Sequence, residues 1–199
     1  MINSENKAWD ILTGLDPVVV CNRSLVTYDD VSGTYTLKSF ACKMSITPKD
    51  AAITVNCPEC SLIPDDQVSH VKQFALFYLI NAQNIPLSGN LIKPDRLTGG
   101  QIYVKGSHVL PLNEFAEKYG EDPDSFFVRG MDIGGEKLNY GDASMRFFPV
   151  PRIPVTVILW KKDDEFSAHS NLLLDSTCEN HLPADIIWST VSICVRLLL

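Results

Sequence analysis

No apolar stretch of this sequence approaches the roughly 20 residues that a helix needs to cross a bilayer. The first residues, "MINSENKAWDILTGL", also lack the positively charged segment followed by an apolar one that a secretory signal carries. These two absences predict a cytoplasmic protein with no membrane partner.

Basic residues are scarce as well. The chain has 17 Lys and Arg against 24 Asp and Glu, which gives a formal net charge of −7 and a pI near 5.0. No run of Lys and Arg offsets that sign locally, as a general binder of phosphate backbones would need. We therefore expect no nucleic-acid partner.

Recognisable catalytic signatures are missing too. The glycine-rich stretches "LSGN" and "LTGGQ" have neither the Lys-Ser/Thr ending of a P-loop nor the spacing of a dinucleotide-binding loop. The four histidines are scattered, and no Ser-His-Asp or Cys-His arrangement has a nucleophile context. The sequence thus leaves open whether the protein is an enzyme.

The residues that are present predict an α+β fold. With 199 residues, 45% of them hydrophobic, the chain can bury a substantial core, and we expect a single compact domain over residues 1–199. Helical spacing and helix-start signals mark residues 4–15, 15–24, 65–83, 110–120, 122–131 and 182–199, with Asp65 or Asp66 expected to cap the third. Strand patterns fall between these helices: three within 25–55, two within 84–106, and others at 143–148, 154–160 and 170–175. Strands and helices in segregated blocks favour antiparallel sheets packed against helices.

The cysteines offer one candidate metal site. Six are present, and because no secretion signal accompanies them we expect most to be reduced. Cys57 and Cys60 form a Cys-x-x-Cys pair in "CPEC", and Cys178 and His181 stand three apart in "CENH". Together they would make a Cys₃His set, which tetrahedral zinc accepts, provided that the fold brings the two pairs together.

Two other interpretations of "CPEC" stay open. The pair could be a redox dithiol, although the negative charge of Glu59 would raise the thiol pKa and the next helix begins too late to lower it. Alternatively, both cysteine-containing segments are turns, and their thiols are incidental.

A second constellation lies in the last third of the chain. It combines carboxylates, arginines and a tryptophan that could meet at one rim of the C-terminal sheet and bind a ligand: Asp142, Arg146, Arg152, Trp160, Glu165 and Asp175. An acid pair with a cation suits acid–base or hard-metal chemistry. The alternative is structural, because charged hairpin turns are normally solvated and arginines pair with carboxylates in structural networks.

Motifs spread over nearly the whole chain resemble those of a prokaryotic family of unknown function, domain of unknown function 3786. The motifs, in order, are "AWDILTGLDPVVVCNRS", "PLSG", "LTGGQIY", "YGEDPDSF", "GDAS", "PRIPVTVILW", "DDEF", "LLLDST" and "HLPADI". The resemblance implies an origin in anaerobic bacteria or archaea and a contextual link to corrinoid or iron–sulfur metabolism, because some members carry an additional iron–sulfur cluster domain. The present chain has no four-cysteine run of the ferredoxin type.

From these observations we expect a non-catalytic accessory domain that binds a small molecule, a cofactor or a partner protein. Abundant aromatic residues in the last third favour an apolar cleft. A metal-dependent enzyme that uses the Asp/Glu cluster or a Cys₃His zinc site is the alternative. An apolar groove could instead serve a homodimer.

Overall fold

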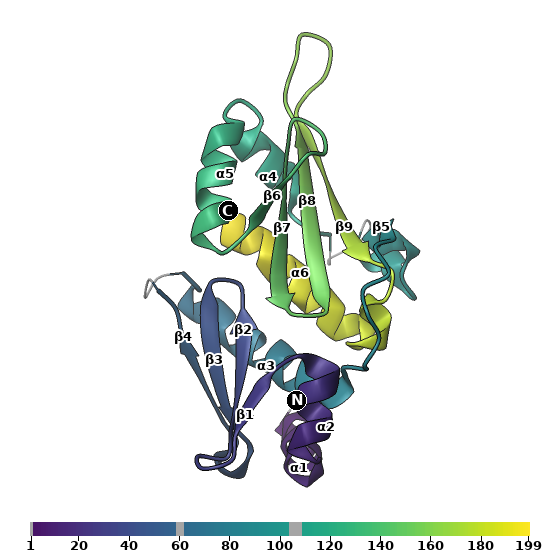
Figure 1. The fold of residues 1–199 in the computed structure, drawn as a ribbon. Coiled ribbons are helices and arrows are strands. Elements are labelled where there is room, and N and C mark those ends of the chain that lie inside the picture. The colour runs from purple at the N-terminus through teal and green to yellow at the C-terminus, as the bar shows by residue number, and fades with distance from the viewer. Residues whose placement is uncertain (1, 59–61, 104–108) are drawn as a thin grey trace.

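The computed structural model describes residues 2–58, 62–103 and 109–199. Two antiparallel sheets and the helices that cover them make up the fold (Figure 1). The α-helices are α1 (Ile2–Gly14), α2 (Pro17–Ser24), α3 (Asp65–Asn81), α4 (Leu112–Tyr119), α5 (Pro123–Asp132) and α6 (Ala184–Leu198). Short 3₁₀ turns are η1 (Pro48–Asp50), η2 (Pro94–Arg96), η3 (Gly100–Tyr103) and η4 (Cys178–Asn180).

The first sheet is a four-stranded meander in the order β1-β2-β3-β4. Its strands are β1 (Thr27–Asp29), β2 (Thr34–Ser39), β3 (Cys42–Thr47) and β4 (Ala52–Asn56). Burial alternates along β2 and β3, so that Leu37, Met44 and Ile46 lie on a buried face. The opposite face carries polar residues, among them the exposed Lys38 and Lys43. This alternation is typical of an antiparallel sheet with one solvated face.

The second sheet has five strands in the order β5-β9-β8-β7-β6. They are β5 (Leu91–Ile92), β6 (Glu136–Leu138), β7 (Ala143–Val150), β8 (Ile153–Trp160) and β9 (His169–Asp175). Helices α4, α5 and α6 contact its strands, and β8 at its centre is buried along nearly its whole length. A near-continuous apolar run in β8 is therefore explained by its central position.

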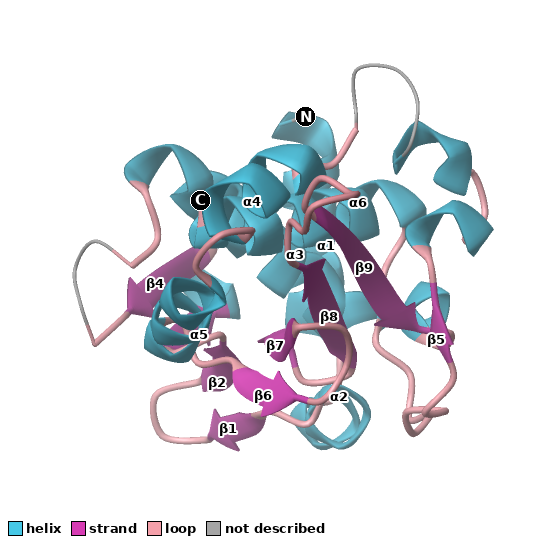
Figure 2. Ribbon diagram, turned by 90° about the horizontal axis from the view of Figure 1, so that it is seen from above, coloured by secondary structure: helices cyan, strands magenta, loops and turns pink. Residues whose placement is uncertain are grey.

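Helices α3 and α6 pack against each other and join the two halves of the molecule (Figures 1 and 2). Buried apolar side chains form one cluster that runs through both halves. A second junction links the sheets directly, because the amide of Phe40, in the β2–β3 turn, donates to the carbonyl of Phe148 in β7 over 2.9 Å. Gly134 lies against the same turn, and a Cβ there would stand 2.9 Å from the amide nitrogen of Ala41.

The predicted α+β class with antiparallel sheets is confirmed, and each of the six expected helices is present. Several details are wrong. The segment 25–55 holds four strands instead of three, and residues 84–103 hold only β5 and two 3₁₀ turns. Pro64, not Asp65 or Asp66, is the N-cap of α3, and no side chain caps it. In the part of the chain that the structure describes, no helix is both long and apolar enough to cross a membrane.

Candidate functional site: a groove between β4 and α3

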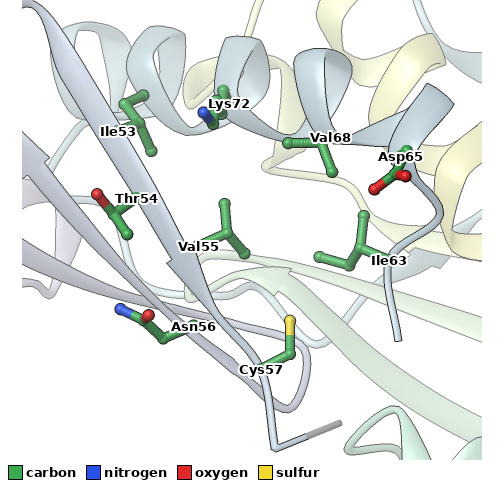
Figure 3. Close-up of a pocket in the computed structure, with 9 residues that line it drawn as sticks. All are labelled: Ile53, Thr54, Val55, Asn56, Cys57, Ile63, Asp65, Val68 and Lys72. Atoms are coloured by element: carbon green, nitrogen blue, oxygen red, sulfur yellow. The ribbon is translucent and has the colours of Figure 1, made fainter. Parts of the chain in front are cut away.

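A groove of about 510 Å³ lies between strand β4 and helix α3. Figure 3 shows its two walls. One is formed by Ile53 and Val55 of β4 and by Cys57, which follows the strand, and the facing wall contributes Ile63 and Val68. Its full lining is Ile53, Thr54, Val55, Asn56, Cys57, Ile63, Asp65, Val68 and Lys72. Apolar side chains thus lie on both walls, and polar side chains make up nearly half of the lining.

The charged residues of the groove stand at opposite ends of its helical wall. Asp65, Val68 and Lys72 follow one another at helical spacing on α3, so they share one face of the helix. Figure 3 places Lys72 beside Ile53 and Asp65 beside Ile63. The ion pairs among the described residues are Arg146 with Glu136 and Lys162 with Glu121. Lys72 therefore has no carboxylate partner within the described part of the chain.

Strand β4 forms the second wall and is an edge strand of its sheet, with β3 as its neighbour. Cys42 and Cys57 lie across from each other where the β3–β4 register continues past Lys43 and Asn56. Their Cα atoms are 4.2 Å apart, close to the ~4.5 Å of a pair without backbone hydrogen bonds and shorter than the ~5.5 Å of a bonded pair.

Bonded and non-bonded pairs alternate along an antiparallel ladder. The pairs Met44–Val55 and Ile46–Ile53 are consequently of the non-bonded kind. The N–H and C=O groups of Ile53 and Val55 then point away from β3, toward the free edge of the sheet. Outside this ladder, no described residue forms a backbone hydrogen bond with either of them. Ile53 and Val55 thus line the groove with their side chains and present beside it backbone groups that no described residue pairs with.

The predicted Cys₃His site is not assembled among the described residues. Cys57 forms a disulfide with Cys42, so its sulfur is not a free thiolate, and Cys60 lies outside the described residues. No group of three or more His, Cys, Asp and Glu side chains that could hold a metal occurs in the described ranges. The disulfide between Cys42 and Cys57 was not predicted from the sequence, and Cys21, Cys178 and Cys194 are free.

Cys178 and His181 lie together in and just after turn η4, where the amide of His181 donates to the carbonyl of Cys178. Both side chains are fully buried. Burial, followed by the charge of Glu179, raises the pKa of the Cys178 thiol to about 12. Burial, reinforced by the nearby Arg152 charge, lowers the pKa of His181 to about 4. Both groups are held in their neutral forms, and His181 Nε2 has no hydrogen-bond partner among the described residues.

Two of the predicted ligand-binding residues, Arg152 and Asp175, are buried and form hydrogen bonds that hold separate segments of the chain together. The Arg152 guanidinium donates to the carbonyls of Arg23, Ile85 and Asn22 and to the side-chain oxygen of Asn84. The carboxylate of Asp175 accepts bonds from the backbone and side chains of residues that adjoin it in the fold: Ser88, Gly89 and Thr177. These hydrogen bonds outweigh burial and lower the pKa of Asp175. The polar atoms of both side chains are largely engaged within the protein.

The other four lie elsewhere on the same sheet. Asp142 accepts a hydrogen bond from the amide of Lys161. That amide lies at the start of the β8–β9 hairpin, which holds the exposed Glu165. Trp160 stacks on His169 with ring centroids 4.8 Å apart. Arg146 pairs with Glu136 on the sheet surface. Asp142, Trp160 and Glu165 stand near the Trp160 end of β8, and Arg146 lies opposite Thr156 near the middle of that strand. Arg152 adjoins the Ile153 end. An eight-residue strand separates the ends by more than ~20 Å, so the structure does not gather the predicted set at one rim.

Three further hollows lie beside α4, between α3 and α6, and near η2. Neither Trp160 nor Asp175 lines one of these hollows or the groove between β4 and α3. Sequence reasoning therefore missed the residues of the groove, notably Ile63, Val68 and Lys72. The signals available were the apolar face of α3 and the end of the strand block at Asn56. The separation between the two walls depends on tertiary packing.

A family model described as "Domain of unknown function (DUF3786)" matches residues 16–197. The resemblance drawn from the sequence motifs is thereby confirmed. Neither a curated protein nor a solved structure matches the chain.

Proposed function

This chain belongs to the DUF3786 family, and we propose that it is a non-catalytic binding domain whose binding surface is the groove between β4 and α3. The observation that carries this proposal is the combination of two apolar walls with an unpaired strand edge in one concave site of about 510 Å³. Such a site offers both apolar burial and directional hydrogen bonds to an incoming molecule.

The state of the buried polar groups supports a binding role over a catalytic one. A reactive cysteine needs a lowered pKa, whereas burial raises the pKa of Cys21, Cys178 and Cys194. The carboxylate of Asp175 is fully engaged in tethering the 88–89 loop. These groups stabilise the fold and are poorly placed to attack a substrate or to transfer a proton.

The experiment compares wild-type protein with a variant whose groove is filled. Val68→Trp places an indole between the walls, and Val128→Trp, on an exposed position of α5, is the matched control. Each protein is screened against a fragment library by ligand-observed NMR and panned with a displayed random-peptide library, after its melting temperature has been compared with that of the wild type. We expect ligands that bind the wild type and Val128→Trp and that Val68→Trp loses. Equal binding to all three proteins would contradict the proposal.

The remaining expectations from the sequence stay predictions. They are the cytoplasmic location, the anaerobic origin, the link to corrinoid or iron–sulfur metabolism, and the homodimer, which light scattering would test. The zinc site and the metal-dependent enzyme also remain predictions, and elemental analysis of protein purified without chelator is their direct test.

A further inference from the structure

We propose that the groove binds an extended, acidic segment of a partner protein, which adds to the free edge of β4 as a fifth strand of the first sheet. This inference rests on the proposed function and names the class of partner. It draws on the backbone groups that β4 presents, on the side chains beneath them and on the charges around them.

The backbone of β4 provides the attachment. Because the N–H and C=O groups of Ile53 and Val55 point away from β3, they form one row of donors and acceptors at the edge of the sheet. Many proteins shield such an edge with a bulge, a proline or an inward-pointing charge. Within Ala52–Asn56 there is no proline and no charged residue. An extended peptide can therefore continue the ladder, which is the geometry of β-strand addition.

The groove selects the side chains of such a peptide. Successive side chains of a strand point to opposite faces of the sheet. Every second side chain of the added strand would thus lie on the same face as Ile53 and Val55, opposite Ile63 and Val68 of the other wall. Those positions require apolar residues, and the positions between them face solvent beside Thr54 and Asn56. The expected segment alternates between apolar and polar residues.

The charges on the solvent-facing side of the first sheet favour acidic residues at the polar positions of the added strand. Lys38 and Lys43 lie directly opposite each other on β2 and β3, and both are exposed. Like charges in that position destabilise a sheet, and within the described residues neither lysine has a carboxylate partner. Lys72 in the groove also has no carboxylate partner among the described residues. On a chain of net charge −7, Lys38 and Lys43 lie on the solvent-facing side of the sheet that the polar positions of the added strand would share. Lys72 lines the groove, with Asp65 at the opposite end of its helical wall. Three lysines without a carboxylate partner among the described residues thus outnumber the one groove carboxylate, which makes this edge complementary to an acidic segment.

A second copy of this chain fits the site less well than a partner segment does. Pairing β4 with β4 of another copy would place the Lys38 and Lys43 of both copies on one continuous sheet face, and each copy carries a net charge of −7. The edge is only five residues long, which is little for the roughly 1,200 Å² or more that a stable interface buries. The geometry therefore favours a flexible peptide.

The test uses three fluorescein-labelled peptides and the full chain with its disulfide intact. The first alternates Glu and Val over seven residues, the second replaces each Glu by Lys, and the third has the composition of the first with its valines in one block. Fluorescence anisotropy measures binding. We expect saturable binding of the first peptide, and binding weaker by about tenfold or more for the other two. Equal binding of the Glu and Lys peptides would overturn the acidic specificity.

A pair of variants tests the backbone contact. Val55→Pro removes the N–H that points to the free edge, and proline is tolerated at such an edge position, whereas Val55→Thr keeps the N–H and the branched shape. We expect Val55→Pro to weaken binding of the alternating Glu/Val peptide about tenfold or more and Val55→Thr to change it by less than about threefold. Similar affinities for two folded variants would overturn strand addition.

Methylated peptides give the same test without altering the protein. In an added strand the amides of alternate residues face β4 and the others face solvent. N-methylation of all valines or of all glutamates should therefore abolish binding in one case and spare it in the other, and equal effects would overturn the proposal.

If random-peptide panning enriches basic or non-alternating sequences that Val68→Trp loses, the acidic strand is wrong and the binding function stands. If Val68→Trp loses no ligand of any kind, the binding function itself is wrong.

Discussion

The buried His181 should make the stability of this protein depend on pH between about 4 and 6.5. Burial and the Arg152 charge lower the pKa of His181 from 6.5 to about 4, and its side chain is fully buried. Between these two values the unfolded chain binds a proton that the folded chain excludes. The contribution to stability is therefore fully present above pH 6.5 and is lost as the pH falls toward 4.

The size of this effect follows from the difference between the two pKa values. Each pKa unit corresponds to about 1.4 kcal/mol, so the free energy of unfolding should fall by roughly 3 kcal/mol between pH 7 and pH 4. Urea unfolding at several pH values measures that loss. His181→Asn is the matched control, since it keeps a polar side chain that does not titrate.

The difference between wild type and His181→Asn isolates the histidine from the carboxylates. It should change by about 3 kcal/mol over this pH range. A difference that stays constant from pH 7 to pH 4 would refute the assignment of a neutral, buried imidazole.

Three further predictions concern the hydrogen bonds of Arg152, the disulfide and the contact between the two sheets at Gly134. Arg152→Met leaves up to four part-buried acceptors without the guanidinium and should lower the free energy of urea unfolding by about 2 kcal/mol or more. A loss under about 1 kcal/mol would show that water replaces the guanidinium. The double variant Cys42→Ala/Cys57→Ala removes a link across 15 residues and should cost about 3 kcal/mol, whereas reductant should leave its urea midpoint unchanged and shift that of the wild type. Gly134→Ala combines a φ of +84° with backbone atoms about 3 Å from the new Cβ, while Gly99→Ala, at φ +71°, meets open space. Thermal unfolding should therefore show a larger loss for Gly134→Ala, by about 1 kcal/mol or more, and equal losses would argue against the close contact.

Local patterns in the sequence predicted the helices well because their signals are local. Pro17 and Pro123 each follow an aspartate whose side chain accepts a bond from the first turn of its helix. Helical spacing within 65–83 likewise predicted α3, which packs against α1, α2 and α6. The short strands β1, β5 and β6 gave weaker signals, since two or three residues show little alternation.

The disulfide could have been predicted from the sequence. The segment "TPKD" has the composition of a turn and centres the β3–β4 hairpin between Lys49 and Asp50. A register about that centre places Cys42 opposite Cys57. The spacing of "CPEC" drew attention to Cys60 instead. A cross-strand partner is a stronger constraint on a cysteine in a strand than a neighbour in the sequence.

The role of Arg152 could not have been read from its neighbours in the chain. Its acceptors are carbonyls at the end of α2 and in the 84–85 segment, up to 130 residues away in sequence. The groove could not have been predicted from local sequence either, because its width depends on how α1 and α6 pack against α3 beside the first sheet. Only the assembled fold brings these groups together.

Backbone amide exchange at β4 tests the central claim most directly. In the free protein, Ile53 and Val55 should exchange rapidly by solution NMR because their amides have no acceptor among the described residues. Thr54, paired with Ser45 in the ladder, should exchange slowly. Adding the alternating Glu/Val peptide should slow Ile53 and Val55 and leave Thr54 unchanged. Slow exchange of Ile53 and Val55 in the free protein, or rapid exchange that the bound peptide does not alter, would contradict strand addition at β4.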